Sequence, residues 1–306
     1  MIKKQQDFFS FWLAIFVISL AIACNSNPVA EAQKDKPYEG AIHISVDETF
    51  KPVIEEQLKM YKSTFPNATI NVSYKPEVAC FKDLQSDSTR MIITARKLDT
   101  TERKFFESNL RFKPTQDVVA YDAVTVLLNK NNKDSIYTIE KLRNILSGKN
   151  PVMVVMDGNN ATSTVRYIKD SVLRGLPFGS NVVAAKNSKN VIEIISENES
   201  AIGFVGLSWV GDKYDKEQQK TLVNTKFALV ECTKCNDGTF AKPSQYTITF
   251  SQYPLARPLY CIVKENYPGL GTGFYNFLSL ERGQLIFRRA FLAPAKMAFM
   301  KSKTNI

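Results

Sequence analysis

The sequence has very little histidine. A single His, His43, stands among 306 residues, and GxSxG, HExxH and Walker A patterns are absent. Those patterns supply the serine nucleophile of α/β-hydrolases, the zinc ligands of metalloproteases and the phosphate-binding loop of P-loop NTPases, respectively. His43 lies in an alternating apolar stretch, which predicts an ordinary strand residue. The sequence therefore argues against an enzyme. A phosphatase or hydrolase remains an alternative, but its serine would need an unusual base.

Cysteine is also scarce, with five residues in the chain. Cys232 and Cys235 form the only CxxC pattern, and neither a second CxxC nor a nearby His completes a zinc site. A structural disulfide, two free thiols and a redox-active pair all remain open for these two residues. We expect neither a metal nor a cofactor.

No apolar run is long enough for a confident transmembrane helix. The longest, Phe8–Ala23, follows Lys3 and Lys4 and ends just before Cys24, and a span needs about 20 residues. This arrangement resembles a bacterial lipoprotein signal, in which residues 1–23 are removed and Cys24 is lipidated. The lipid would hold the protein on a membrane surface, most simply on the periplasmic side. Cleavage without lipidation is the alternative. Residues 24–39 lack apolar periodicity and are expected to form a flexible tether.

Long runs of like charge are missing as well. The chain has 40 Lys and Arg against 30 Asp and Glu, a net charge of +10. The basic residues are scattered along the chain, which argues against nucleic acid as a partner. A basic surface of this kind favours anionic ligands.

Stretches with strand-like and helix-like patterns alternate along the chain. Alternation at this spacing predicts βαβ units and a mostly parallel sheet, hence an α/β fold. Val118–Leu128 and Gln252–Val263 are too long for simple strands, and we expect them to cross between two lobes. Residues 213–238 are polar and are expected to be irregular, whereas residues 273–295 are expected to be helical. The predicted division is residues 40–120 for the first part of lobe 1, 121–252 for lobe 2, and 253–306 for the hinge return and the rest of lobe 1.

Three loops follow predicted strands: Asp47–Phe50, Thr94–Lys97 and Asp157–Arg166. Ligands of open α/β sheets bind beyond the carboxyl ends of strands. Hydroxyls and helix N-termini in such loops suit a small oxyanion. In the third loop these hydroxyls would also serve simply to cap a helix. The pattern predicts a cleft between two lobes that holds a small anion.

Several stretches, in this order, resemble the phosphate-binding proteins of bacterial Pst-type ABC transporters, a branch of the type II periplasmic binding proteins. They are Val119–Asn129 (VAYDAVTVLLN), Tyr137–Gly148 (YTIEKLRNILSG), Ala201–Val205 (AIGFV), Tyr253–Tyr260 (YPLARPLY), and Gly283-Gln284 before Pro294. The chain is similar to a Bacteroidetes-type lipoprotein version. The resemblance implies two α/β lobes, two hinge strands and a ligand cleft. It also implies a monomeric receptor that captures phosphate and delivers it to ABC permease subunits in the membrane.

The resemblance also implies a set of ligand-binding residues. Thr49 and Phe50 correspond to the family's first-loop ligands, and Arg96 to the arginine of its Ser-Arg-Pro-Leu stretch. Arg166 could replace a missing arginine if its side chain turns back toward the helix N-terminus. The third-loop ligands would be Thr162, Ser163 and Thr164.

This chain departs from the family pattern at several of these positions. Glu77 lies where the family has Gly-Ser-Gly, Ala95 replaces a serine, and Asp157 or Asn159 lies where an arginine is usual. Ser163 replaces the glycine of the third loop. Glu77 would have to pair with Arg96 or another cation, or accept the proton of monohydrogen phosphate. Two alternatives follow: the same fold binding a different small anion or phosphorylated metabolite, or a non-transport surface protein whose cleft is locked by Glu77 and Arg96.

Overall fold

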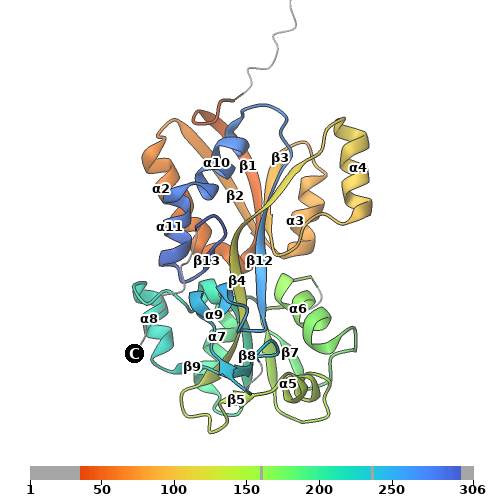
Figure 1. Ribbon diagram of the computed structural model, residues 1–306, viewed down its shortest axis with the longest axis vertical. Helices are drawn as coiled ribbons and strands as arrows, with labels where there is room; N and C mark the ends of the chain where they lie inside the picture. Colours follow the sequence, from red (N-terminus) through yellow and green to blue (C-terminus); the bar gives the residue numbers. More distant parts are fainter. Residues whose placement is uncertain (1–34, 159–160, 236–237, 298–306) are drawn as a thin grey trace, which may run out of the picture. The chain divides into compact units, whose positions relative to one another are not determined.

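The computed structural model describes residues 35–297 except 159–160 and 236–237 (Figure 1). The predicted signal peptide, the lipidation site Cys24 and most of the tether lie outside the described residues. Within the described part, every helix is too short or too polar to cross a membrane. The elements below all belong to the unit formed by Lys36–Ile306.

Three parallel strands form the sheet of lobe 1. β1 pairs with β2 on one side and with β3 on the other. The strands are β1 (Gly40–Asp47), β2 (Ala68–Lys75) and β3 (Thr89–Thr94). The helices that follow them are α2 (Lys51–Thr64), α3 (Glu77–Leu84) and α4 (Thr100–Leu110). Val53, Ile54 and Tyr61 of α2 are buried on its apolar face, and a capping box formed by Asp99 and Glu102 begins α4.

Lobe 2 has a second parallel set of strands, in which β6 pairs with both β7 and β8. These strands are β6 (Val154–Met156), β7 (Val182–Ala184) and β8 (Ile202–Gly206), and the helices around them are α5 (Ile139–Leu146), α6 (Ser163–Ile168) and α7 (Ser188–Glu197). Together with β1–β3, they confirm the predicted parallel βαβ pattern.

The segment expected to be irregular contains short elements. They are α8 (Lys216–Leu222), β9 (Thr225–Phe227) and β10 (Leu229–Glu231), and β10 pairs with β5 (Ile136–Tyr137) and β11 (Phe240–Ala241). Elements of two to seven residues give no readable periodicity, so pairing with distant strands decides their structure. Directly after β10, Cys232 and Cys235 form a disulfide, so the alternative of two free thiols was wrong.

Two long strands, β4 (Thr115–Asn129) and β12 (Ala256–Val263), run between the lobes as antiparallel neighbours. Figure 1 shows both passing from one lobe to the other. β12 pairs with β3 in lobe 1, whereas β4 pairs with β8 in lobe 2, so a single sheet runs through the hinge in the order β2-β1-β3-β12-β4-β8-β6-β7. The predicted two-lobed architecture with two hinge strands is confirmed.

The C-terminal part returns to lobe 1 as two helices rather than one. They are α10 (Leu270–Ser279) and α11 (Glu281–Arg289), separated by the extended residue Leu280. The short strand β13 (Ala293–Pro294) follows them and pairs with β4. The prediction of continuous helix over residues 273–295 was therefore wrong at both the break and the end.

Each lobe has its own apolar core. The core of lobe 1 includes Phe50, Ile54 and Phe274, and that of lobe 2 includes Leu142 and Phe204, all buried. Burying one such side chain contributes about 1.5–3 kcal/mol. Two separately stabilised lobes joined by two strands provide a frame in which polar groups can meet between them.

Candidate functional site

The first loop begins at Asp47, the last residue of β1. Its carboxylate accepts a hydrogen bond from the Thr49 backbone N–H at 3.1 Å and so caps the short helix η1 (Glu48–Phe50). Thr49 and Phe50 are buried. The second carboxylate oxygen of Asp47, Oδ2, makes no aligned hydrogen bond among the described residues, although Asp47 is 1% exposed and the Ser163 hydroxyl lies near its carboxyl group. This loop therefore presents a hydroxyl and a buried carboxyl group.

The third loop ends at the N-terminus of α6. Thr162 caps the helix by accepting the Val165 N–H, and its own hydroxyl donates to Asp157 at 2.8 Å. Ser163 and Thr164, in the first turn, are fully buried. In the described part of the chain, the Thr164 hydroxyl makes no aligned hydrogen bond, but it faces Asp157 and lowers the pKa of that carboxyl against the effect of burial. Of the three predicted residues, Thr162 thus shapes the loop, whereas Ser163 and Thr164 bring buried hydroxyls to the first turn of α6.

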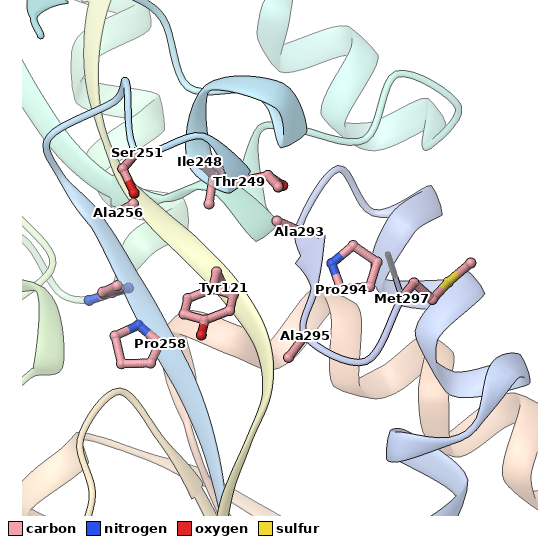
Figure 2. Close-up of a pocket in the computed structure, with 11 residues that line it drawn as sticks. Tyr121, Ile248, Thr249, Ser251, Ala256, Pro258, Ala293, Pro294, Ala295 and Met297 are labelled. Atoms are coloured by element: carbon pink, nitrogen blue, oxygen red, sulfur yellow. The ribbon is translucent and has the colours of Figure 1, made fainter. Parts of the chain in front are cut away.

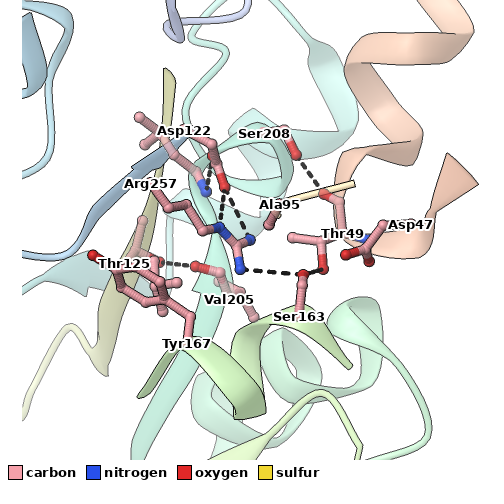
Figure 3. A network of polar contacts seen from close by, with 12 residues as sticks. Asp47, Thr49, Ala95, Asp122, Thr125, Ser163, Tyr167, Val205, Ser208 and Arg257 are labelled. Atoms are coloured by element: carbon pink, nitrogen blue, oxygen red, sulfur yellow. Dashed lines mark hydrogen bonds and ion pairs between the residues drawn. The ribbon is translucent and has the colours of Figure 1, made fainter. Parts of the chain in front are cut away.

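These two loops come together between the lobes. The Thr49 hydroxyl lies 3.4 Å from the Ser163 hydroxyl and 3.5 Å from an Asp157 carboxylate oxygen. Behind it, the Ser208 hydroxyl donates to the Thr49 carbonyl at 2.6 Å. Figure 3 shows Thr49 and Ser163 pointing toward each other from opposite lobes. The structure therefore brings the first and third loops together in one place.

A buried arginine from the hinge completes this group. Arg257 of β12 donates from Nε to Asp122 at 3.0 Å and from Nη1 to the Ser163 hydroxyl at 3.2 Å (Figure 3). Its third nitrogen, Nη2, also lies 3.0 Å from Asp122, but it makes no aligned hydrogen bond within the described chain. Arg257 and Asp122 are both 0% exposed and are register partners across the hinge. We call Asp47, Thr49, Ser163, Thr164 and Arg257 the cleft network.

Sequence reasoning did not select Asp47 or Arg257 as ligand residues. A signal for Arg257 was present, because each long hinge strand carries one charged residue inside an apolar run: Asp122 in one and Arg257 in the other. Opposite charges in two buried neighbouring strands must pair to avoid a large desolvation cost. Asp47 had a weaker signal as the last residue before a ligand loop.

The cleft network has the chemistry of a small oxyanion site. Asp47, Thr164 and Arg257 each bury a polar atom that makes no aligned hydrogen bond within the described residues, although Nη2 of Arg257 lies 3.0 Å from Asp122. A buried unpaired atom costs about 1–3 kcal/mol unless water or a ligand pairs it. Guanidinium and hydroxyl groups donate hydrogen bonds to the oxygens of an oxyanion. An ionised carboxylate such as Asp47 accepts a hydrogen bond from a protonated oxygen of the ligand. The arrangement suits a tetrahedral oxyanion that carries at least one proton.

Burial strongly affects the acids around the network. Burial, with added repulsion from Glu77, raises the pKa of Asp47 to about 7. The pKa of Glu48 is also raised to about 7, chiefly by burial, and burial raises the pKa of Asp122 and of Asp157. Near neutral pH, a part of the Asp47 and Glu48 carboxyl groups is therefore protonated and does not repel an anion.

The two other predicted arginines lie outside the cleft network. Arg96 pairs with Glu102 at 2.7 Å within lobe 1 and lies over the ring of Phe81. Arg166 pairs at 2.5 Å with Glu77, whose carboxylate also accepts the Ala95 N–H at 3.0 Å. Of the alternatives for Glu77, the structure thus shows pairing with another cation rather than with Arg96.

Two pockets lie elsewhere in lobes 1 and 2. Figure 2 shows one of about 420 Å³ at the hinge, where Tyr121 and Pro258 face Pro294 and Met297. Apart from Arg257, its lining is uncharged. The other, of about 480 Å³, lies between α2, α7 and α8 and is lined by five carboxylates against two lysines. Neither lining suits an anion as well as the cleft network does. The described residues include no cluster of metal-ligating side chains.

Known proteins are similar to this chain in sequence and in fold. The family model of the PBP superfamily domain matches residues 28–281. The phosphate-binding protein PstS of Pseudomonas aeruginosa is 22% identical, with 97% of each chain covered. A protein from Clostridium perfringens, described as a phosphate ABC transporter substrate-binding protein and solved with bound phosphate, has a TM-score of 0.69 at 22% identity, covering 84% of this chain and all of that one. An ABC-type phosphate transport receptor from Vibrio cholerae has a TM-score of 0.61 at 17% identity, covering 83% of this chain and all of that one.

Proposed function

Since this chain belongs to the family of PBP superfamily domains, we propose that it is a substrate-binding protein that captures phosphate for an ABC importer. It performs no chemistry in this role. The relatives described above are named as phosphate-binding proteins or receptors, which supports phosphate as the ligand. The fold alone would not choose between anions.

The observation that carries the proposal is the meeting of buried polar groups from three parts of the chain. Thr49 comes from lobe 1, Ser163 from lobe 2 and Arg257 from the hinge, and the side chains of Thr49 and Arg257 both contact the Ser163 hydroxyl. An anion there would touch both lobes and the strand that joins them. Binding would therefore favour the closed arrangement, as a capture protein requires.

We assign the anion contacts as follows. Thr49, Ser163 and Thr164 donate from their hydroxyls, and Phe50 contributes backbone at the start of α2. Arg257 supplies the positive charge that the family's missing loop arginine would give. Thr162 supports the site by capping α6 and orienting Asp157. Arg96 and Arg166 support the site through their pairs with Glu102 and Glu77.

We also propose that the receptor is attached to a membrane next to its permease. Cleavage before Cys24 and lipidation of that residue would attach the chain to the outer face of a bacterial inner membrane. Residues 24–39 would tether lobes 1 and 2 within reach of the permease subunits. A monomer suffices, because one chain supplies every group of the cleft network.

Titration calorimetry on protein stripped of ligand by unfolding and refolding tests the proposal. We expect phosphate to bind with a Kd of about 1 μM or lower, a free energy of about −8 kcal/mol or better. Thr164→Val keeps the shape and removes the buried hydroxyl, so it should weaken binding about tenfold. Thr69→Val, on the exposed part of β2, is the matched control and should bind like the wild type. No heat with phosphate would contradict the proposal.

A second candidate keeps the fold and changes the ligand. The carboxylates of Asp47, Asp122 and Asp157 lie around the site, and they favour an anion of low charge over a fully ionised one. A native mass spectrum of protein purified without added ligand separates the two candidates. A mass excess equal to phosphoric acid supports phosphate, and a larger excess supports a phosphorylated metabolite.

A further inference from the structure

A second group of contacts joins the lobes beside the cleft network. Glu77 begins α3 in lobe 1, and Arg166 lies in α6 of lobe 2. Arg166 donates to the Glu77 carboxylate from Nε at 2.5 Å and from Nη2 at 3.2 Å. The next residue, Val78, donates its backbone N–H to the Ala161 carbonyl of lobe 2 at 3.2 Å. We call Glu77, Val78, Ala161 and Arg166 the interlobe clasp.

The clasp is organised in advance on the lobe 1 side. The Glu77 side chain is 2% exposed, and its Oε1 already accepts the Ala95 N–H from the same lobe. The carboxylate also lies at the N-terminus of α3, where negative charge is favourable. Its position is therefore fixed whether or not lobe 2 is near, and closing the cleft costs little side-chain entropy on this side.

The lobe 2 side keeps its charge accessible. The Arg166 side chain is 29% exposed and lies 3.6 Å from Asp170, its neighbour one turn along the helix. Arg166 therefore has water and a second carboxylate when the lobes separate. A two-bond arginine–carboxylate pair of this kind forms and breaks without stranding either charge in an apolar core.

The contacts of the clasp are made by protein groups alone. We propose that the interlobe clasp closes the cleft in the absence of any anion, so that the ligand binds to and stabilises a conformer that is already the main one. In that case the anion does not have to supply the whole free energy of closure, and Glu77 is a residue that sets the resting position of the lobes. The inference concerns lobe closure and does not depend on the identity of the ligand.

Distances between spin labels test this directly. The full chain, with Cys24→Ser to avoid lipidation and labelling, would carry labels at Lys104→Cys on α4 and Lys149→Cys beyond α5, both exposed. Cys80 and Cys261 are buried, and the other two cysteines are bonded to each other. Pulsed electron resonance would be recorded without anion and with excess inorganic phosphate.

We expect one short distance in the wild type, unchanged by phosphate. Glu77→Gln keeps the size and the Ala95 hydrogen bond but removes the charge, and should add a longer distance without anion. Arg166→Gln should do the same from the other lobe, and the double variant should open no further than either single one. Glu102→Gln weakens an arginine pair wholly inside lobe 1 and should leave the short distance unchanged.

Two results would overturn the inference. One is a wild type that shows the long distance without anion and the short one with phosphate. The other is a Glu77→Gln or Arg166→Gln variant that stays closed like the wild type; if one of them does not fold, the other decides. These measurements without anion stand apart from calorimetry, so an absence of phosphate binding would refute the proposed function and leave this inference standing.

Discussion

Two arginine–carboxylate pairs lie at the cleft, and they differ in what they join. Arg257 and Asp122 join two strands that are already neighbours in one sheet, and both side chains are 0% exposed. Arg166 and Glu77 join two lobes that can separate, and Arg166 is 29% exposed. The same chemistry therefore serves two purposes. The hinge pair holds a positive charge in a fixed place, whereas the clasp pair forms only when the two lobes are together.

The hinge pair should give the largest effect on stability. Arg257→Met leaves the Asp122 carboxylate buried without its partner, which should lower the free energy of unfolding by about 3–5 kcal/mol. Adding Asp122→Leu should recover much of that loss in urea unfolding, because an apolar pair replaces an ionic one. Phosphate binding should stay abolished in the double variant. Recovery of binding together with stability would show that Arg257 does not contact the anion.

The buried acid of the first loop should make stability depend on pH. The pKa of Asp47 is raised to about 7 in the folded protein, so its contribution is fully present below about pH 4 and is lost as pH rises through 7. Asp47→Asn should flatten this decline, which amounts to roughly 1–4 kcal/mol, in urea unfolding between pH 4 and 8. Glu48, with its pKa also raised to about 7, acts in the same direction and leaves a residual slope. A decline as steep in Asp47→Asn as in the wild type would contradict this account.

The clasp pair should matter less for unfolding than the hinge pair. Arg166→Gln leaves Glu77 with the Ala95 N–H, and water reaches the exposed side of the pair. We expect a loss of about 1 kcal/mol in the free energy of unfolding. A loss as large as that of Arg257→Met would erase the distinction between the two pairs.

The smallest stability effect is expected at Thr49. Among the described residues its hydroxyl makes only long contacts, of 3.4 and 3.5 Å, so Thr49→Val should change the free energy of unfolding by under about 0.5 kcal/mol. Calorimetry should nevertheless show phosphate binding weakened about tenfold, because we propose that this hydroxyl donates to the ligand. Unchanged affinity would remove Thr49 from the site.

Much of the fold could be predicted because it follows from local patterns. The apolar spacing of Val53, Ile54 and Tyr61, the capping box at Asp99 and the great length of β4 are all readable without tertiary contacts. The short elements of residues 216–231 and the break at Leu280 were not readable. Pairing between distant segments decides them, rather than local periodicity.

The candidate site could be predicted only in part for a related reason. Thr49, Ser163 and Thr164 were predicted as ligand residues because they stand in loops at strand ends, where the fold class places ligands, and the structure brings Thr49 and Ser163 together. The partnerships of Arg257 with Asp122 and of Arg166 with Glu77 span 135 and 89 positions in the sequence. A single sequence gives the charges of these residues and a reason for each to be paired, but it does not give the pairing.

Anomalous diffraction from crystals grown with arsenate, a heavier analogue of phosphate, would test the central claim most directly. We predict one arsenic peak between the lobes, within hydrogen-bonding reach of the Thr49, Thr164 and Arg257 side chains. An arsenic peak only in the hinge pocket beside Tyr121, or no ordered arsenic at all, would contradict the account.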